Sequence, residues 1–247
     1  MPIFQVLGPV EVTGQGGPPD RMLPAKPRTL LAALLLRPNQ WVPTAHLVET
    51  LWERPPRSAH GNLRTYVWQL RTLLAGTADT DRLDSRLGLY RLAVQPGEID
   101  MQVFTELSDL AAEALAAGEA AAAERLLLTA LRLWRGDPFE DVPALLSQPK
   151  VVRLREQRWS ASEMLAEARL MLGQSQRAVD DLRPLLAEQP FREQMWILLM
   201  HGLTQLGRRA DALAAYREVS HLLSSELGLE PGPRLRDAQR MILTGAA

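Results

Sequence analysis

The sequence contains no cysteine. Disulfide bonds, thiol catalysis and cysteine-based zinc sites are therefore excluded. The four histidines, His46, His60, His201 and His221, lie far apart in the chain and show no metal-ligand spacing. Neither of the common glycine-rich phosphate motifs, G-x-x-x-x-G-K-[ST] or G-x-G-x-x-G, is present. We therefore expect no metal, no cofactor and no enzymatic activity.

Long apolar runs are also missing. The longest runs from Leu30 to Leu36, whereas a membrane-spanning helix needs about 20 apolar residues. The first residues lack the basic region and apolar stretch of a secretory signal. With 46% hydrophobic and 23% charged residues, the composition is typical of a folded globular chain. We expect a soluble, cytoplasmic protein that has no membrane partner.

Lysine is scarce, because Lys26 and Lys150 are the only two and arginine carries the remaining positive charge. The charges are unevenly distributed along the chain. Residues 1–97 hold 11 Arg/Lys and 7 Asp/Glu, a net of +4, and residues 98–247 hold 17 and 22, a net of −5, which together give −1. A basic first part and an acidic second part are consistent with DNA at one end and a protein partner at the other.

Residues 3–97 show a sequence of short elements separated by turn residues. The expected order is a strand at Ile3 to Leu7, a strand at Val10 to Thr13, a turn cluster at 14–19, a helix with Pro27 in its first turn, a helix N-capped by Thr44, a helix from Ser58 to about Leu74, and a hairpin of Arg82 to Arg86 and Tyr90 to Val94. Three helices followed by a hairpin are typical of a winged helix-turn-helix, in which the third helix enters the major groove of DNA.

The third helix has separate apolar and polar faces. Leu63, Val67, Leu70 and Leu74 fall within about 60° of arc and predict the core face. No acidic residue occurs anywhere between Ser58 and Leu74. Because an ordinary exposed helix mixes both signs of charge, this absence favours a surface that faces phosphates.

Residues on this helix and on the hairpin are candidate DNA contacts. Thr65, Gln69 and Asn62 suit base edges, and Gly61 permits a close approach of the helix. Arg64 reaches guanine or phosphate, while Arg71 and the hairpin arginines suit the backbone. Trp68 has two interpretations: contact with a sugar or thymine methyl, or burial under a neighbouring element. The predicted contacts are Ser58, Asn62, Arg64, Thr65, Trp68, Gln69, Arg71, Thr72, Arg82, Arg86 and Arg91.

From Asp100 onward the pattern predicts helices throughout. Gly173 and Gly207 lie 34 residues apart, which is the period of tetratricopeptide repeats. Gly118 marks a third unit, and the longer gap to Gly173 indicates about 21 inserted residues around Trp134 to Pro149. A final helix from Pro233 to Leu243 is expected to cap the open end of the repeat array.

Several segments together give the chain a family resemblance. They are Phe4 to Val10, Lys26 to Arg28, Leu47 to Trp52, Leu63 to Arg71, Leu131 to Gly136, Pro190 to Glu193 and Glu226 to Gly232. With these segments the chain resembles the actinomycete antibiotic regulatory proteins, the SARP family, over nearly its whole length. The resemblance implies a mainly α fold with a small β component. It places an OmpR-like winged helix at residues 1–97 and a tetratricopeptide-like bacterial transcriptional activation domain at 98–247.

The same resemblance implies the function and the partners. SARP proteins bind direct repeats in promoter DNA as side-by-side protomers. They recruit RNA polymerase, through its sigma and alpha subunits, and activate secondary-metabolite (antibiotic) gene clusters. Such a protein is associated with the nucleoid. The segment Ala59 to Asn62 and Trp68 depart from the recognition helix expected for the family. We therefore expect this chain to bind a different DNA sequence from other members. Neither the ATPase of larger members nor a phosphorylated receiver domain is expected.

A second function remains open, a tetratricopeptide-type adaptor that binds peptides and for which DNA binding is incidental or lost. A polar groove lined by basic residues would favour the adaptor. A groove filled by the helix from Pro233 would disfavour it.

Overall fold

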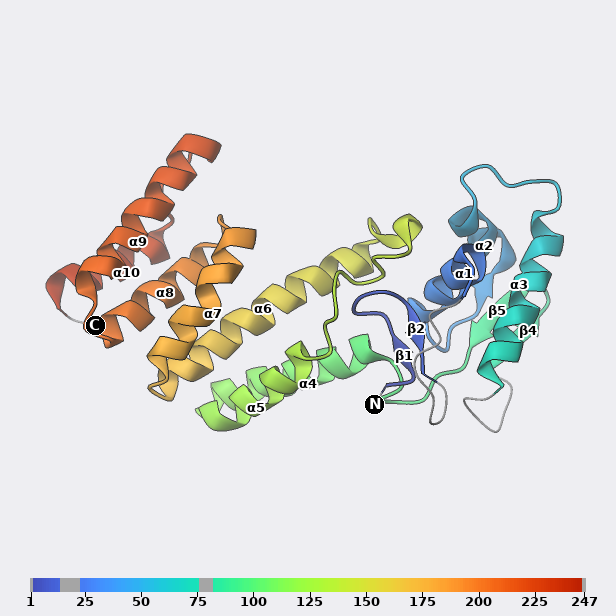
Figure 1. Ribbon diagram of the computed structural model, residues 1–247, viewed down its shortest axis with the longest axis horizontal. Helices are drawn as coiled ribbons and strands as arrows, with labels where there is room; N and C mark the ends of the chain where they lie inside the picture. Colours follow the sequence, from blue (N-terminus) through green and yellow to red (C-terminus); the bar gives the residue numbers. More distant parts are fainter. Residues whose placement is uncertain (1, 14–22, 76–81, 246–247) are drawn as a thin grey trace. The chain divides into compact units, whose positions relative to one another are not determined.

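The computed structural model describes residues 2–13, 23–75 and 82–245 (Figure 1). The predicted turn cluster at 14–19 lies outside the described residues. The fold is mainly α with two small antiparallel sheets, as the sequence predicts. Two compact units are present, Met1–Glu106 with Ala130–Arg158, and Leu107–Thr129 with Trp159–Ala247. This division differs from a single cut after residue 97, which stays a prediction about domain boundaries.

A two-stranded antiparallel sheet lies near the start of the first unit. Its strands, β1 (Phe4–Gln5) and β2 (Glu11–Val12), are shorter than the predicted strands. The reason is that the backbone N–H groups of Val6 and Leu7 donate to the carboxylate of Asp100, at 2.9 and 3.0 Å. Those N–H groups are therefore not available for a longer β1–β2 ladder.

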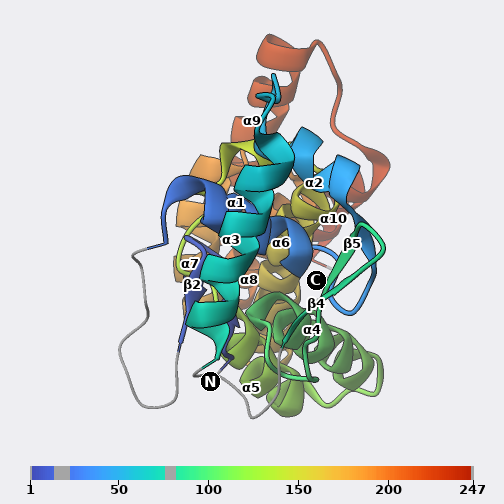
Figure 2. The same cartoon turned by 90° about the vertical axis from the view of Figure 1, so that its right-hand side faces the viewer.

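Three helices follow and pack together (Figure 2), namely α1 (Ala25–Leu35), α2 (Thr44–Leu51) and α3 (Ala59–Leu74). The predicted leucine stripe of α1 is buried, and this helix contacts both α2 and α3. Pro27 lies in the first turn of α1, where its missing N–H removes no helical hydrogen bond. The predicted positions of all three helices are confirmed.

Of the two predicted N-caps, Thr44 is wrong, and Ser58 is confirmed in position only. Thr44 is the first residue of α2, preceded by Pro43 at the N-cap position, and its hydroxyl bonds outside the helix. Ser58 occupies the N-cap position of α3 but makes no capping hydrogen bond with its side chain. Its hydroxyl instead accepts a 3.3 Å hydrogen bond from the Nδ2 of Asn62.

The predicted hairpin is confirmed as β4 (Leu83–Arg86) and β5 (Leu89–Leu92). A short strand that the sequence did not indicate, β3 (Val42–Pro43), pairs with the other side of β5. The sheet order is β3-β5-β4. Proline is tolerated in β3 because this strand lies at an edge of the sheet. The hairpin turn consists of Leu87 and Gly88 only, since Leu89 already pairs with Arg86.

The remainder of the chain holds seven α-helices within the described ranges. They are α4 (Asp100–Ala116), α5 (Ala120–Leu131), α6 (Pro149–Met171), α7 (Ser175–Glu188), α8 (Glu193–Gln205), α9 (Arg209–Leu222) and α10 (Pro233–Thr244). A π-helical turn, η2 (Leu223–Leu227), extends α9. The expectation of helices throughout is wrong for residues 132–148, which contain only the short 3-10 helix η1 (Pro143–Leu145).

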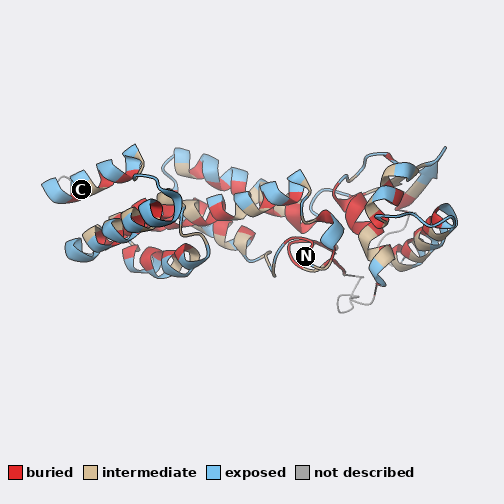
Figure 3. Ribbon diagram, turned by 90° about the horizontal axis from the view of Figure 1, so that it is seen from above, coloured by how far each residue is buried: buried red, intermediate tan, exposed pale blue. Residues whose placement is uncertain are grey.

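The repeat pattern is confirmed in the second unit. Gly173 and Gly207, with φ 71° and 74°, each end one helix and precede the next. Helix α8 packs against α7, α9 and α10. The capping helix is present as α10, and it buries Leu235, Ala238 and Ile242. In Figure 3 these helices carry buried residues along one side and exposed residues along the other, as the amphipathic pattern predicts.

Candidate DNA-binding interface

Helix α3 has one buried face and one exposed face. Its buried residues include Leu63, Val67, Leu70 and Leu74, which confirms the predicted core face. The exposed residues are Ser58 at the N-cap and His60, Gly61, Arg64, Thr65, Trp68 and Thr72 on the helix. None of them is acidic. The helix therefore presents a polar surface without negative side chains, and Figure 2 shows α3 at the surface of its unit.

A cavity of about 410 Å³ lies between α3 and the hairpin. It is lined by Thr44, His60, Arg64 and Ser85 to Tyr90. Arg64 comes from the helix and Arg86 from the hairpin, and no acidic residue lines the cavity. A concave site with two guanidinium groups concentrates positive potential, which attracts anions such as phosphate.

The tip of the hairpin is fixed to the helices. Thr44 donates two hydrogen bonds to the carbonyl oxygen of Gly88, one from its backbone N–H at 2.9 Å and one from its hydroxyl at 2.7 Å. The hairpin is thereby held at a defined position beside α3, as a wing must be if both elements are to contact the same duplex.

Arg71 connects α3 with the hairpin. Its Nε and Nη2 donate to the carbonyl oxygen of Leu83 at 3.0 and 2.9 Å, and Nη2 also donates to the hydroxyl of Ser85 at 3.1 Å. The sequence predicted a phosphate contact for Arg71. In the structure most of its donors are used to position the wing.

The three predicted hairpin arginines have different environments. Arg82 is 7% exposed, and its guanidinium donates to both carboxylate oxygens of Glu98 at 2.6 and 2.7 Å. Arg91 pairs with Asp84 at 2.6 Å. Arg86 is exposed and lines the cavity with Arg64. Of these three arginines, Arg86 is the one placed to meet a phosphate in that cavity.

The pKa of Glu98 reflects its ion pair. The hydrogen bond from Arg82 holds the pKa of this carboxyl below its ordinary value, against the opposing effect of burial. Glu98 is therefore ionised at neutral pH and keeps the guanidinium of Arg82 engaged.

Trp68 and Gln69 differ from each other in exposure. The side chain of Trp68 is 65% exposed, so the interpretation that it is buried under a neighbouring element is wrong. Gln69 is half-buried, and its Oε1 accepts no hydrogen bond from any described residue. The geometry thus supports base contacts by Trp68 more directly than by Gln69.

The remaining predicted contacts lie on the exposed side of α3 or beside it. Asn62 is half-exposed in the first turn, next to Ser58. The hydroxyls of Thr65 and Thr72 donate to helix carbonyls one turn earlier, at 3.4 and 3.1 Å. Their oxygen lone pairs remain able to accept hydrogen bonds from a ligand.

Two residues at this interface were not predicted. His60 lies one helical turn before Arg64 and lines the cavity with it; the i, i+4 spacing was the available signal. Leu87 lies between the two predicted hairpin strands, and no contact was assigned to it. It is 91% exposed.

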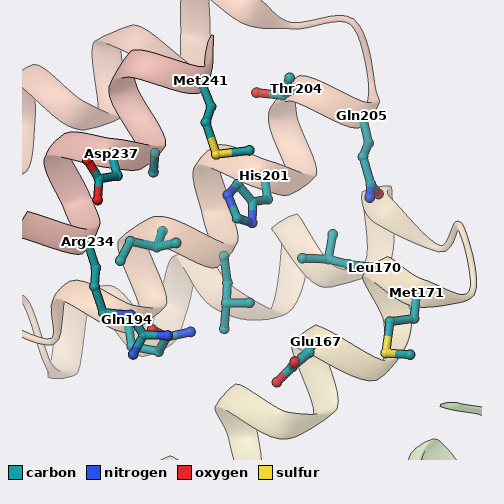
Figure 4. Close-up of a pocket in the computed structure, with 13 residues that line it drawn as sticks. Glu167, Leu170, Met171, Gln194, His201, Thr204, Gln205, Arg234, Asp237 and Met241 are labelled. Carbon is teal, nitrogen blue, oxygen red and sulfur yellow. The ribbon is translucent and has the colours of Figure 1, made fainter. Parts of the chain in front are cut away.

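The second unit contains a cavity of about 660 Å³ whose lining residues come from α6, α8 and α10 (Figure 4). Its lining is apolar at Leu170, Ile197 and Leu198, and burial lowers the pKa of His201 within it. Its charged residues are Glu167, Arg234 and Asp237, which carry both signs. Helix α10 forms part of the wall. This lining is not the polar, basic groove that a peptide-binding adaptor predicts.

Membrane spans and metal sites concern the described ranges of the chain, residues 2–13, 23–75 and 82–245. No helix there is long and apolar enough to cross a membrane. No group of three or more histidine, aspartate or glutamate side chains there is arranged to hold a metal ion.

Two families of known proteins match separate parts of the chain. Residues 20–86 match the family described as transcriptional regulatory protein, C terminal, and residues 99–243 match the bacterial transcriptional activator domain. The regulatory protein DnrI of Streptomyces peucetius is 34% identical over 97% of this chain and 91% of its own length. The chain belongs to the SARP family. This membership confirms the family resemblance that the sequence segments predict.

Larger relatives share this SARP module. The regulatory protein AfsR of Streptomyces griseus is 35% identical over 97% of this chain, which spans 24% of AfsR. The solved structure of Mycobacterium tuberculosis EmbR in complex with a low-affinity phosphopeptide has a TM-score of 0.93 at 34% identity, covering 98% of this chain and 65% of the EmbR chain. The chain thus spans about a quarter of AfsR and about two thirds of EmbR.

Proposed function

We propose that this SARP chain is a sequence-specific DNA-binding transcriptional activator. Helix α3 enters the major groove, and the β4–β5 wing reaches the adjacent backbone and minor groove. The observation that carries the proposal is the cavity between α3 and the wing, where Arg64, His60 and Arg86 meet without an acidic neighbour. Such a cavity suits the phosphate backbone that runs between the two grooves.

The exposed residues of α3 and the arginines that already bond to other residues have different roles in this proposal. Arg64 and Arg86 neutralise phosphates, while Asn62, Thr65 and Trp68 face the base edges. Ser58 and Thr72 lie at the two ends of the exposed face, where they reach backbone oxygens. Arg71, Arg82 and Arg91 act on DNA indirectly, because their donors hold the wing, and Gln69 packs beneath the surface.

The activator role rests on the second part of the chain. We assign residues 1–97 to DNA binding and 98–247 to activation, in line with the activator-domain match at residues 99–243 and the net charge of −5 over 98–247. In this proposal protomers bind side by side on direct repeats in promoters. They recruit RNA polymerase through its sigma and alpha subunits, and the protein works in the cytoplasm on the nucleoid. Membership of the SARP family, to which the relatives DnrI and RedD point, supports an antibiotic gene cluster as the target.

Chromatin pull-down with sequencing would identify the promoter fragments, and fluorescence anisotropy would then compare them with random DNA. We expect tighter binding to the recovered fragments. The double variant Arg64→Ala with Arg86→Ala should weaken binding to all sequences and lower the salt slope by about two units, since each phosphate contact contributes about one.

The matched control is the double variant Arg125→Ala with Arg183→Ala, which removes two exposed arginines of the second unit. It should bind the promoter as the wild type does. Equal affinity of the wild type for promoter and random DNA would refute sequence-specific binding. An unchanged salt slope in the Arg64/Arg86 variant would refute the proposed interface.

A further inference from the structure

Leu87 is the most exposed of the large apolar side chains in the described part of the chain. It lies at the first position of the two-residue wing turn, and its side chain is 91% exposed. Burial in the fold therefore contributes almost nothing at this position, because nearly all of the side chain remains in water.

The backbone of the turn also disfavours leucine. Leu87 has φ 46° and Gly88 has φ 77°, so both turn residues lie in the left-handed region. Two-residue hairpin turns of this kind favour Asn-Gly or Gly-Gly. Residues other than glycine, asparagine and aspartate are strained in the left-handed region, because their Cβ comes too close to the backbone. Neither the turn nor the core explains a leucine at this position, which indicates a contact outside the chain.

The position of Leu87 is fixed and its surroundings are basic. The two hydrogen bonds from Thr44 hold the carbonyl of Gly88. Leu87 shares the cavity lining with Arg64 and Arg86, and no acidic residue lines that cavity. An exposed apolar group in the same cavity lining as two guanidinium groups fits a duplex, since phosphates flank the apolar sugar carbons and the stacked faces of the bases.

We propose that Leu87 enters the minor groove of the bound DNA as an apolar wedge and makes binding depend on the deformability of the base step that it meets. This inference rests on the proposed DNA-binding function. Side chains such as leucine open base steps from the minor groove, and pyrimidine–purine steps open most easily. The protein therefore prefers an easily deformed base step at a position of the DNA site that α3 does not touch.

The decisive variant is Leu87→Asn, because asparagine suits the left-handed conformation of the turn. We expect an unchanged or higher Tm, together with a loss of promoter affinity of about tenfold or more, as removal of a buried leucine contact implies. The control Leu229→Asn changes a leucine that is 55% exposed in the second unit and should bind as the wild type does. Leu87→Gly provides a second variant that the turn accepts.

A second readout tests the base step. Replacement of a TA or CA step under the wing by an A-tract should weaken the wild type several-fold and leave Leu87→Asn unaffected, since A-tracts resist deformation. If wild-type protein does not prefer its promoter, the proposed function fails. If the wild type prefers the promoter and Leu87→Asn binds it equally tightly, only the wedge fails. A variant that binds DNA normally but no longer activates transcription in vitro would place Leu87 against a protein and also overturn the wedge.

Discussion

The guanidinium of Arg82 donates hydrogen bonds to both carboxylate oxygens of Glu98, at 2.6 and 2.7 Å. The two side chains are 6% and 14% exposed. One oxygen of Glu98 also accepts the backbone N–H of Gln95 at 2.7 Å. The pair therefore fixes the segment that leaves the wing, and the loss of one partner would leave a buried charge unpaired.

Arg82→Ala is expected to destabilise the protein by about 3 kcal/mol, because it leaves the carboxylate of Glu98 buried without its cation. Urea denaturation followed by circular dichroism measures this change. The double variant Arg82→Ala with Glu98→Gln should recover part of the loss. Arg86→Ala, by contrast, should leave stability unchanged and lower the salt slope of DNA binding by about one unit. An Arg82→Ala protein of normal stability but reduced salt slope would show that Arg82 contacts DNA directly.

A charge-preserving variant separates the two roles of Arg71. Lysine keeps the positive charge but lacks the forked donors that reach Leu83 and Ser85. We expect Arg71→Lys and Arg71→Ala to lose similar amounts of DNA affinity, with each destabilised by about 1–2 kcal/mol. Anisotropy titrations at several salt concentrations, paired with thermal unfolding, test this expectation. If Arg71→Lys binds like the wild type while Arg71→Ala binds weakly, a phosphate contact is the dominant role.

The helices of the first unit were predictable because their signals are local. The apolar period of α3, from Leu63 to Leu74, identifies its buried face without any tertiary information. The partners of the arginines are not local. Arg82 pairs with a residue 16 positions away, and Arg71 bonds to the carbonyl of Leu83, 12 positions away. A count of charges on one helix cannot show which guanidinium is already engaged.

In the irregular segment at residues 132–148, too, the sequence did not reveal contacts between residues far apart in the chain, here between backbone groups. The N–H of Arg135 donates to the carbonyl of Leu7 at 2.7 Å, and the N–H of Phe139 donates to that of Val6 at 2.9 Å. These long-range bonds replace helical ones, so local composition misleads. The 34-residue repeat was predictable because each helix packs on its neighbours in sequence, as α7 and α9 do on α8.

Thr44→Val tests whether the fixed wing tip matters for binding. Valine preserves the shape of the side chain but removes the hydroxyl that bonds to Gly88, so we expect a loss of about 1 kcal/mol in stability. Promoter affinity should fall several-fold, because the wing is held less firmly before it meets DNA. Thr44→Ser retains the hydroxyl and serves as the control in the same anisotropy assay. Equal affinities of the valine and serine variants would show that the hydrogen bond does not position the wing for DNA.

Asp100 makes the stability of the first unit fall as the pH rises, the opposite of what a carboxyl group with a lowered pKa does. Burial raises the pKa of its carboxyl to about 6, against the lowering effects of hydrogen bonds from Leu7 and Val6 and of the charge of Arg135, whose Nη2 lies 4.0 Å away. The folded protein therefore binds a proton more tightly at Asp100 than the unfolded chain does. The resulting stabilisation is complete below the ordinary pKa of 3.8 and is lost as the pH rises through about 6.

Asp100→Asn should remove this contribution, because asparagine does not titrate. Between pH 4.5 and 7.5 we expect the difference in unfolding free energy between wild type and variant to change by on the order of 2 kcal/mol, and to favour the wild type at the acidic end. Urea denaturation at both pH values measures the change. Glu98→Gln is the control of opposite sign, since the lowered pKa of Glu98 stabilises the fold at high pH and loses its effect as the pH falls. Parallel profiles of unfolding free energy against pH for the wild type and Asp100→Asn would contradict this expectation. Asp100 would then have the same pKa in the folded and unfolded chains. Its buried hydrogen bonds with Val6 and Leu7 would in that case offset the full cost of its desolvation.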